Sequence, residues 1–489
     1  MPPKPLSVLY VASEVYPFAK TGGLADVSYA FPIAMRDLGH DIRVMLPKYG
    51  NISERKNHIH QINRLCDIPI PVGDISEPAT VKSSSINNPR TKVQAYVTTN
   101  FNYFDAKKGL YSDPVTGAMY NNDERFIFFA RTVIQTCLLL GWFPEIIHCN
   151  GWQTGLLPAY LRTMYAKEFA KTKIIFTIHN LSEQGVFPAA SFAKTGLPKE
   201  AMAKVTQGKT LNFTKAALEY ADVVTTVSPT YAQDIVKDKK IAGDLFPLVK
   251  TKKIRGIING IDPYGWMPKS DTHISKHYDI NSWKQGKHAN KQKLHDKLGL
   301  PFDENIPLIG VVTRISESKG IPLFLEAAPK LLSEKVQVVF LGDGDVKMKK
   351  ELEKLATKFK KNFALRLGFD DELAHLIEAG SDMFLMPSLY EPCGLNQMYS
   401  MMYGTVPVVR ATGGLIDTVQ DYDAKKKTGN GIVFKKHAAA DLLAAVSKGT
   451  KLFQDKDAWA ELVTNCMKSD FTWIASAKQY DGIYRDMVK

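Results

Sequence analysis

Lysine and glycine residues adjoin one another in a short segment near the start of the chain, and this combination is suited to binding phosphate. The segment Lys20-Thr21-Gly22-Gly23-Leu24-Ala25-Asp26-Val27 lies between an apolar stretch and a stretch with helical periodicity. Gly22 and Gly23 let a ligand approach the backbone closely and supply amides at a helix start, where the helix dipole favours phosphate. Lys20 adds a mobile positive charge. A Gly-Gly turn alone is often structural, so the interpretation depends on the whole eight-residue string.

Two cations follow a later apolar stretch. Leu308 to Thr313 leads into Arg314-Ile315-Ser316-Glu317-Ser318-Lys319-Gly320, and we expect Arg314 and Lys319 to project from a strand-to-helix loop. Arginine binds a diphosphate through a bidentate fork, whereas lysine acts as a point charge. The alternative is a solvated loop in which two charges are close by chance.

Glu391 is the candidate group for binding a sugar. It follows the apolar stretch Met383 to Pro387 and precedes a helix that we expect Gly394 to open. A carboxylate at this position can accept hydrogen bonds from sugar hydroxyls. The alternative is that Glu391 only caps its own helix, because acidic residues stabilise a helix N-terminus. Cys393 and Leu395 belong to the same candidate site, although Cys393 is most simply explained as a packed or hydrogen-bonded turn residue.

Further strand ends carry polar or glycine-rich turns. Thr412-Gly413-Gly414-Leu415 offers amides suited to phosphate or ribose. Gly342-Asp343-Gly344-Asp345 is a weaker signal and equally consistent with a plain turn. His179-Asn180 closes another apolar stretch, where we weigh substrate contact against a structural histidine. Asn259-Gly260 is interpreted as a hinge or a ligand contact.

Several kinds of chemistry lack sequence support. The His, Cys, Asp and Glu residues show no metal-ligand spacing, so the sequence predicts no metal and no cofactor. It contains no GxxxxGK[ST] phosphate loop and no GxSxG elbow, which argues against nucleoside triphosphate hydrolysis and serine hydrolase chemistry. Five scattered cysteines without a CxxC pair, and apolar stretches far shorter than a membrane span, predict a cytoplasmic protein without membrane contact.

The formal net charge of +13 allows three explanations. Nucleic acid is one partner of a basic protein, an anionic small substrate is another, and solvated surface is the third. In the segment Lys347 to Lys361, the apolar residues Met348, Leu352, Leu355 and Phe359 recur at helical spacing. The lysines would then occupy the outer face of an amphipathic helix. Because no recognition motif is present, we expect no nucleic acid partner.

The elements that position these residues alternate between strands and helices. The chain begins with a strand at Ser7 to Ala12, a helix at about Asp26 to Leu38 ended by Gly39, and a strand at Asp41 to Leu46. A second series of alternating strands and helices follows the segment Asp262 to Asn290, which we interpret as a domain junction without regular structure. The pattern predicts an α/β protein with two doubly wound, Rossmann-like domains facing a central cleft.

We expect an N-terminal domain at 1–262, a C-terminal domain at 263–473, and a terminal helix at 474–489 that packs back on the first domain. A largely buried helix is expected at Asp123 to Leu140. Further strands and helices are expected at the following residues: Ile146 to His148, Lys173 to Ile178, Val223 to Val227, Ile321 to Leu332, Gln337 to Leu341, Ala364 to Leu367, Asp371 to Ala379 and Val406 to Val409.

With these motifs in order, the chain resembles the bacterial glycogen synthase and plant starch synthase family, retaining glycosyltransferases of the GT-B fold. The resemblance extends over nearly the whole chain and rests on Lys20 to Leu24, Thr177 to Asn180, Thr226 to Ala232, Asn259 to Asp262, Arg314 with Lys319-Gly320, Pro387 to Leu395, and Thr412 to Val419. It implies transfer of glucose from ADP-glucose to the non-reducing end of an α-1,4-glucan. The lysine-threonine-glycine-glycine form of the first motif is the one associated with ADP-glucose.

The resemblance also implies that 1–262 is the glucan acceptor side and 263–473 the nucleotide-sugar donor side, and it implies residue roles. Lys20, Gly23, Arg314 and Lys319 would contact the donor diphosphate, Glu391 the donor glucose, and His179 its hydroxyls. The remaining substrate-binding candidates are Gly22, Asp26, Asn180, Asn259, Cys393, Gly394, Leu395, Thr412, Gly413, Gly414, Trp152 and Gln153. Retention of configuration is consistent either with a carboxylate nucleophile, for which Glu391 is a candidate, or with front-face attack by the acceptor hydroxyl. The sequence leaves both mechanisms open.

Three positions depart from the family pattern. Gly151-Trp152-Gln153 replaces the usual Asp-Trp-His, Glu183 replaces a tyrosine, and Phe104 stands where a tyrosine near the acceptor is common, with Tyr103 beside it. These changes leave two alternatives open: a GT-B transferase with another donor or acceptor, and a glucan-binding protein that has lost catalysis.

Overall fold

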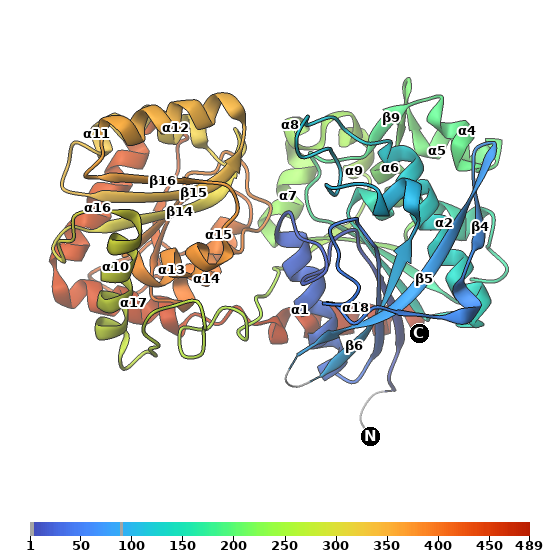
Figure 1. Cartoon of the computed structure of the whole chain (residues 1–489), viewed down its shortest axis with the longest axis horizontal. Coiled ribbons are helices and arrows are strands. Elements are labelled where there is room, and N and C mark those ends of the chain that lie inside the picture. Colours follow the sequence, from blue (N-terminus) through green and yellow to red (C-terminus); the bar gives the residue numbers. More distant parts are fainter. Residues whose placement is uncertain (1–3, 89–90) are drawn as a thin grey trace. The chain divides into compact units, whose positions relative to one another are not determined.

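In the computed structural model, which describes residues 4–88 and 91–489, the chain forms two units, each built around its own sheet (Figure 1). Unit 1 consists of Met1–Gly260 and Trp473–Lys489, and unit 2 of Ile261–Thr472. The chain leaves and re-enters unit 1 at one place, because Gly260 packs directly on Trp473; a Cβ on Gly260 would lie 2.6 Å from the Trp473 Cα.

The large sheet of unit 1 has the strand order β13-β12-β8-β7-β1-β2-β6-β5-β3, with β4 paired to β5. The pairs from β13 to β6 are parallel, and those of β5 with β3, β4 and β6 are antiparallel. The central strands are apolar almost throughout, as expected for parallel strands covered on both faces. The strands are β1 Ser7–Val11, β2 Asp41–Pro47, β3 His60–Gln61, β4 Ile68–Val72, β5 Ile75–Asn87, β6 Lys92–Thr99, β7 Ile146–Asn150, β8 Lys173–Ile178, β12 Val223–Thr226 and β13 Ile254–Gly256.

The helices of unit 1 begin and end close to the predicted residues. Helix α1 ends at Asp37 and is followed by Gly39 at φ +94°, and α2 is capped by Gly141 at φ +63°, both left-handed positions that favour glycine. A small sheet contains β9 Val186–Pro188, β10 Thr206–Gln207 and β11 Thr210–Asn212. The helices are α1 Gly23–Asp37, α2 Asn122–Leu140, α3 Leu157–Thr163, α4 Ser191–Thr195, α5 Met202–Val205, α6 Phe213–Tyr220, α7 Pro229–Lys237, α8 Lys239–Ala242, α9 Phe246–Val249 and α18 Trp473–Val488, with short helices η1 Asn63–Leu65, η2 Phe101–Asp105, η3 Trp152–Thr154, η4 Lys199–Ala201 and η5 Gly243–Leu245.

The terminal helix α18 is part of the core of unit 1. Tyr480 packs on Phe31 of α1 with ring centroids 4.9 Å apart. The hydroxyl of Tyr484 lies 2.7 Å from Nδ1 of His148 on β7. Because these four residues are buried, the helix stabilises the sheet although it lies at the end of the sequence.

The sheet of unit 2 is parallel and has the strand order β16-β15-β14-β17-β18-β19. Alternate residues of β14 lie on opposite faces of the sheet. Ile309 and Val311 pack in the core cluster that contains residues of α11, α12 and α16, whereas Leu308 packs with residues of α10 and α13. Figure 1 shows these helices on either side of the strands. The elements are β14 Leu308–Ile315, β15 Gln337–Gly344, β16 Phe363–Leu367, β17 Met383–Met386, β18 Val406–Arg410, β19 Ile432–Phe434, α10 Trp283–Leu298, α11 Ile321–Leu331, α12 Val346–Lys358, α13 Asp371–Gly380, α14 Asn396–Met402, α15 Gly414–Thr418, α16 Ala439–Gln454 and α17 Lys456–Lys468.

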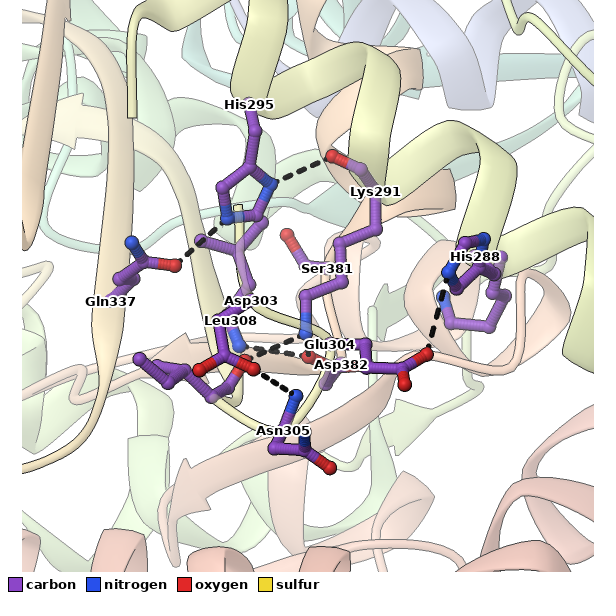
Figure 2. A network of polar contacts seen from close by, with 12 residues as sticks. His288, Lys291, His295, Asp303, Glu304, Asn305, Leu308, Gln337, Ser381 and Asp382 are labelled. Carbon is purple, nitrogen blue, oxygen red and sulfur yellow. Dashed lines mark hydrogen bonds and ion pairs between the residues drawn. The ribbon is translucent and has the colours of Figure 1, made fainter. Parts of the chain in front are cut away.

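The prediction of an irregular junction up to Asn290 is wrong, because helix α10 begins at Trp283. Its inward face is polar, so it shows no apolar periodicity. Lys291 bonds Asp382 at 2.8 Å and the Ile306 carbonyl at 2.7 Å, and the ring of His295 lies 2.8 Å from Oε1 of Gln337 (Figure 2). The helix is therefore held by buried hydrogen bonds in addition to apolar contacts.

In α12 the predicted amphipathic pattern is confirmed: Leu352 is buried and Lys350, Lys354 and Lys358 are exposed.

Among residues 4–88 and 91–489, the structure contains no helix with the length and apolar character needed to cross a membrane.

Candidate active site

The candidate residues of unit 2 gather at the point where its strand order reverses. The first strand, β14, has β15 on one side and β17 on the other, and the crevice beyond the carboxyl ends of such strands is where open α/β sheets bind ligands. Arg314 and Lys319 come from the end of β14, and Glu391 from the loop after β17. The fold thus gathers residues that the sequence predicted for one site.

Lys319 and Glu391 form an ion pair at this edge of the sheet. The Lys319 ammonium bonds both carboxylate oxygens, at 2.8 and 2.7 Å, and Ser388 Oγ donates to one of them at 3.1 Å. The Glu391 side chain is only 5% exposed, so this pairing satisfies a carboxylate that is almost out of water. The alternative that Glu391 caps its helix is wrong. Helix α14 begins at Asn396 rather than Gly394, with Leu395 as its N-cap residue.

Arg314 lies in β14 and not in the following loop, which corrects the prediction. The strand is two residues longer than expected because Arg314 and Ile315 pair in register with Asp343 and Gly344 of β15. The segment Gly342 to Asp345, for which a plain turn was one of two alternatives, is therefore mostly strand. Asp345 then caps α12 by accepting from the Met348 amide. The Arg314 side chain is exposed at the carboxyl edge of the sheet.

The glycine turn after β18 supports Glu391 directly. The Gly414 amide donates to the carbonyls of Glu391 and Pro392, at 3.1 and 3.2 Å, so it is occupied by the protein. Gly413 has φ +47°, and a Cβ there would lie 2.0 Å from the Glu391 carbonyl oxygen. Cys393 is buried against the same turn, since a Cβ on Gly414 would lie 2.5 Å from its Cα. These residues fix the backbone of the Glu391 loop.

The backbone of the loop that carries Lys319 is also fixed by a close glycine contact. Gly320 adopts φ +71°, and a Cβ would lie 1.9 Å from the Pro387 carbonyl oxygen, a contact that only glycine permits. The Tyr390 amide donates to the Ser318 carbonyl at 3.1 Å. The two loops that carry the ion pair therefore touch through their backbones.

In unit 1 the glycine-rich segment is anchored by a residue that the sequence did not reveal. Glu14 accepts hydrogen bonds from the amide of Thr21, from its hydroxyl at 2.7 Å, and from the hydroxyl of Tyr111 at 2.7 Å. Burial raises the pKa of Glu14 in spite of these hydrogen bonds. The only sequence signal was an acidic residue just after an apolar strand. Beside it, Lys20 pairs with Asp26 at 2.8 Å, and α1 begins at Gly23 without a side-chain cap.

His179 lies at the carboxyl end of β8, and its Nε2 is 3.0 Å from Oδ1 of Asn150 on β7. The Asn150 amide nitrogen donates to the carbonyls of Val11 and His148, which fixes the oxygen as the acceptor and places a proton on Nε2. Burial lowers the pKa of His179 to about 4. The imidazole is therefore neutral near pH 7 and presents Nδ1 as an acceptor, suited to a hydroxyl. Asn150 was not predicted.

The residues that depart from the family pattern have local explanations. Gly151 has φ +72°, a backbone conformation that disfavours an aspartate, and Gln153 Oε1 would lie 2.9 Å from a Cβ on Gly151. The glutamine amide thus lies beside the space that a side chain at 151 would need. Trp152 packs edge-on against Phe126, with centroids 5.1 Å apart. Phe104 is fully buried, so it forms part of the core.

Of the two predicted asparagines, Asn180 is hydrogen-bonded within its own turn and Asn259 is buried. The Asn180 side-chain oxygen accepts from the amide and hydroxyl of Ser182, at 3.1 and 2.8 Å, and so closes its own turn. Its amide nitrogen reaches Glu183 at 3.4 Å. Asn259 is buried, beside the contact of Gly260 with Trp473.

The chain is similar to known proteins over nearly its whole length. The family model for the starch synthase catalytic domain matches residues 7–246, and that for group 1 glycosyl transferases matches residues 290–461. The chain is 38% identical over 486 residues to glycogen synthase of Chlorobaculum parvum and 40% identical over 490 residues to that of Syntrophotalea carbinolica, covering 98–99% of both chains in each case.

Among solved structures, the catalytic domain of starch synthase IV from Arabidopsis thaliana, bound to ADP and acarbose, superposes with a TM-score of 0.91 at 30% identity. The match covers 99% of this chain and all of that one. Sucrose-phosphate synthase from Thermosynechococcus elongatus, at 16% identity and a TM-score of 0.61, shares the fold. The predicted GT-B fold is confirmed.

Proposed function

We propose, because the chain belongs to the glycogen and starch synthase family of glycosyltransferases, that it transfers glucose from ADP-glucose to the non-reducing end of an α-1,4-glucan. The reaction retains the configuration at the anomeric carbon and releases ADP. The observation that carries this proposal is the Lys319–Glu391 pair at the switch point of unit 2, where a cation and a carboxylate lie within 2.8 Å.

Donor binding is assigned to groups that complement a sugar diphosphate. Lys319 and the exposed Arg314 would neutralise the phosphates, Arg314 by a bidentate contact and Lys319 as a point charge. The family resemblance assigns Lys20, Gly22 and Gly23 to the donor as well. Adenosine is supported by the form of that motif and by the ADP bound to the starch synthase relative.

The chemistry follows from the leaving group. A nucleoside diphosphate departs without protonation, but its growing negative charge must be stabilised by donors already in place. Lys319 is in place, since the Glu391 ion pair orients its ammonium before substrate arrives. We propose that the transfer step itself uses no metal or cofactor, because protein cations suffice for this role.

Glu391 is better suited to holding the donor glucose than to attacking it. Its carboxylate already accepts three hydrogen bonds, from Lys319 and Ser388, and is almost fully buried. A carboxylate has about four acceptor positions, so one remains for a glucose hydroxyl. Both of its oxygens bond the Lys319 ammonium, which makes them weak nucleophiles. This favours front-face attack, in which the acceptor hydroxyl enters on the side from which the diphosphate leaves and a phosphate oxygen takes its proton.

His179 is assigned to a hydroxyl of the donor glucose. A neutral imidazole whose Nε2–H is committed to Asn150 presents only an acceptor, so it selects a hydroxyl that donates. Trp152 and Gln153 are assigned to the glucan or glucose wall of unit 1.

The test is ADP release by the purified full chain supplied with ADP-glucose, with and without glycogen, beside UDP-glucose as the donor control. Glycogen-dependent ADP release together with chain growth supports the proposal, and digestion of the new linkages by an α-specific glucosidase supports retention. Glucan binding without ADP release would instead support the alternative of a glucan-binding protein that has lost catalysis. That alternative rests on the changes at Gly151 and Gln153.

A further inference from the structure

Three potential metal ligands converge in unit 2, outside the residues assigned to glucose transfer. They are His273, which precedes α10, and Asp371 and His375, one turn apart on α13. One ligand atom from each lies within 4.8 Å of the other two. The sequence predicted no metal because His273 is far from the other two residues in the chain, and only the fold brings the three together.

The imidazole of His375 is oriented as a metal ligand would be. Its Nδ1 lies 2.8 Å from the Asp271 carboxylate, which also accepts a hydrogen bond from the Tyr403 hydroxyl. The ring is buried and stacks on Trp266, with centroids 3.7 Å apart and planes 11° apart. A carboxylate that takes one ring nitrogen fixes the other, Nε2, as the ligand atom, which is the usual outer arrangement around a metal-bound histidine.

The Asp271 carboxylate also contacts the segment that carries His273. An outer carboxylate of this kind fixes the orientation of the ligands that it contacts. The same carboxylate accepts the His273 amide at 2.9 Å and so also positions the second ligand.

The other two ligands are able to move toward an ion. His273 is exposed and Asp371 is partly exposed, and among the residues that the structure describes no hydrogen bond or ion pair engages the Asp371 carboxylate. An ion bound tetrahedrally at about 2.0–2.2 Å would draw its ligand atoms to about 3.4 Å from one another. Side-chain rotation of His273 and Asp371 toward a fixed His375 supplies this contraction.

We propose that His273, Asp371 and His375 form a binding site for a divalent transition metal of the zinc class, with water completing a tetrahedral shell. Two imidazoles and one carboxylate suit zinc better than calcium or magnesium, which take oxygen ligands. The ion would tie the irregular segment before α10 to α13 and so stabilise unit 2. This inference is independent of the proposed transferase activity.

The experiment is zinc binding by the full chain after dialysis against a chelator, measured by equilibrium dialysis and by the thermal unfolding temperature. We expect one tight equivalent of Zn²⁺ and a higher unfolding temperature in its presence. His273→Ala and Asp371→Asn, both at surface positions, should weaken Zn²⁺ binding by at least about tenfold and remove the thermal shift.

The matched control is His288→Ala, which removes an exposed histidine of α10 that faces Glu304 in the loop after this helix (Figure 2). It should bind zinc as the wild-type chain does. A visible spectrum typical of tetrahedral Co²⁺, present in the wild-type chain and lost in His273→Ala, would support the geometry. Equal zinc affinity in the wild-type chain and both ligand variants would overturn the proposal, as would the absence of a tight equivalent in the wild-type chain.

Discussion

Lys319 donates hydrogen bonds to both carboxylate oxygens of Glu391, at 2.8 and 2.7 Å, and thereby joins the loop after β14 to the loop after β17. The lysine side chain is 23% exposed and the glutamate side chain 5%. The same ammonium that is assigned to the diphosphate thus also compensates a carboxylate that has little water. The proposed catalytic role of Lys319 and the stability of the chain therefore depend on the same pair.

Lys319→Ala should lower turnover with ADP-glucose by roughly 10²–10³-fold, because a preorganised charge on the leaving group is lost. It should also lower the free energy of unfolding by about 1–3 kcal/mol, because Glu391 is left without its cation. Steady-state kinetics and urea unfolding measure the two effects.

Lys349→Ala is the matched control, since Lys349 pairs with Asp343 at the surface of the same unit. Exposed pairs contribute about 0–1 kcal/mol, so this variant should keep its turnover and most of its stability. Turnover in a folded Lys319→Ala chain equal to that of Lys349→Ala would remove Lys319 from the mechanism.

Gly413→Ala should impair both stability and activity, because the new Cβ would meet the Glu391 carbonyl oxygen and displace the loop that carries the carboxylate. Gly299→Ala separates the contact with Glu391 from backbone strain. Gly299 also has a positive φ, +71°, but nothing lies within 4 Å of its ideal Cβ. Backbone strain alone costs about 1–2 kcal/mol. We expect Gly413→Ala to exceed this loss and to reduce turnover, whereas Gly299→Ala should keep full turnover; equal effects on both would show that contact with Glu391 is unimportant.

The fold was predictable where local chemistry and burial agree. Strands such as β1 and β8 are apolar runs, and α1 and α2 end at glycines with positive φ, so their bounds follow from the sequence. Helix α10 was missed because Lys287 and Lys291, which face inward, look like surface residues until their buried acceptors are known.

The candidate site was predictable only in part, for a similar reason. Glycines such as Gly320 and Gly413 mark strand ends, and the charged Lys319 and Glu391 stand beside such turns. Glu14 and Asn150 act through other residues, and their partners come from distant segments. No local pattern identifies residues of that kind, since their importance arises only when Thr21 and His179 are placed beside them.

His179 should make stability depend on pH. Burial lowers its pKa in the folded chain to about 4, below the ordinary value of 6.5. Between these values the unfolded chain binds the proton more tightly, so stability is complete above pH 6.5 and decreases as the pH falls toward 4, by roughly 3 kcal/mol for this group. In urea unfolding across this range, His179→Gln should show a shallower pH dependence than the wild-type chain. His60→Gln, at an exposed histidine, is the control; the same slope for all three chains would contradict the assignment.

Glu14 should produce a pH dependence of the opposite sign. Its pKa is raised by burial, so the folded chain holds the proton more tightly than the unfolded chain, and stability decreases as the pH rises from the ordinary value toward the folded one. Glu14→Gln should remove this slope while keeping the loop in place. Its carbonyl can accept from the Thr21 amide, and the hydroxyls of Thr21 and Tyr111 can rotate to accept from its amide nitrogen.

Glu14→Ala, in contrast, releases the segment that carries Lys20 and Gly23. If that segment binds the donor, KM for ADP-glucose should rise by about tenfold or more in the alanine variant, because a small misplacement of binding groups has a large effect. The glutamine variant should keep a nearly normal KM. The two variants thus distinguish the charge of Glu14 from its hydrogen bonds. Equal KM values for the wild-type chain and Glu14→Ala would show that the segment does not need this anchor to bind the donor.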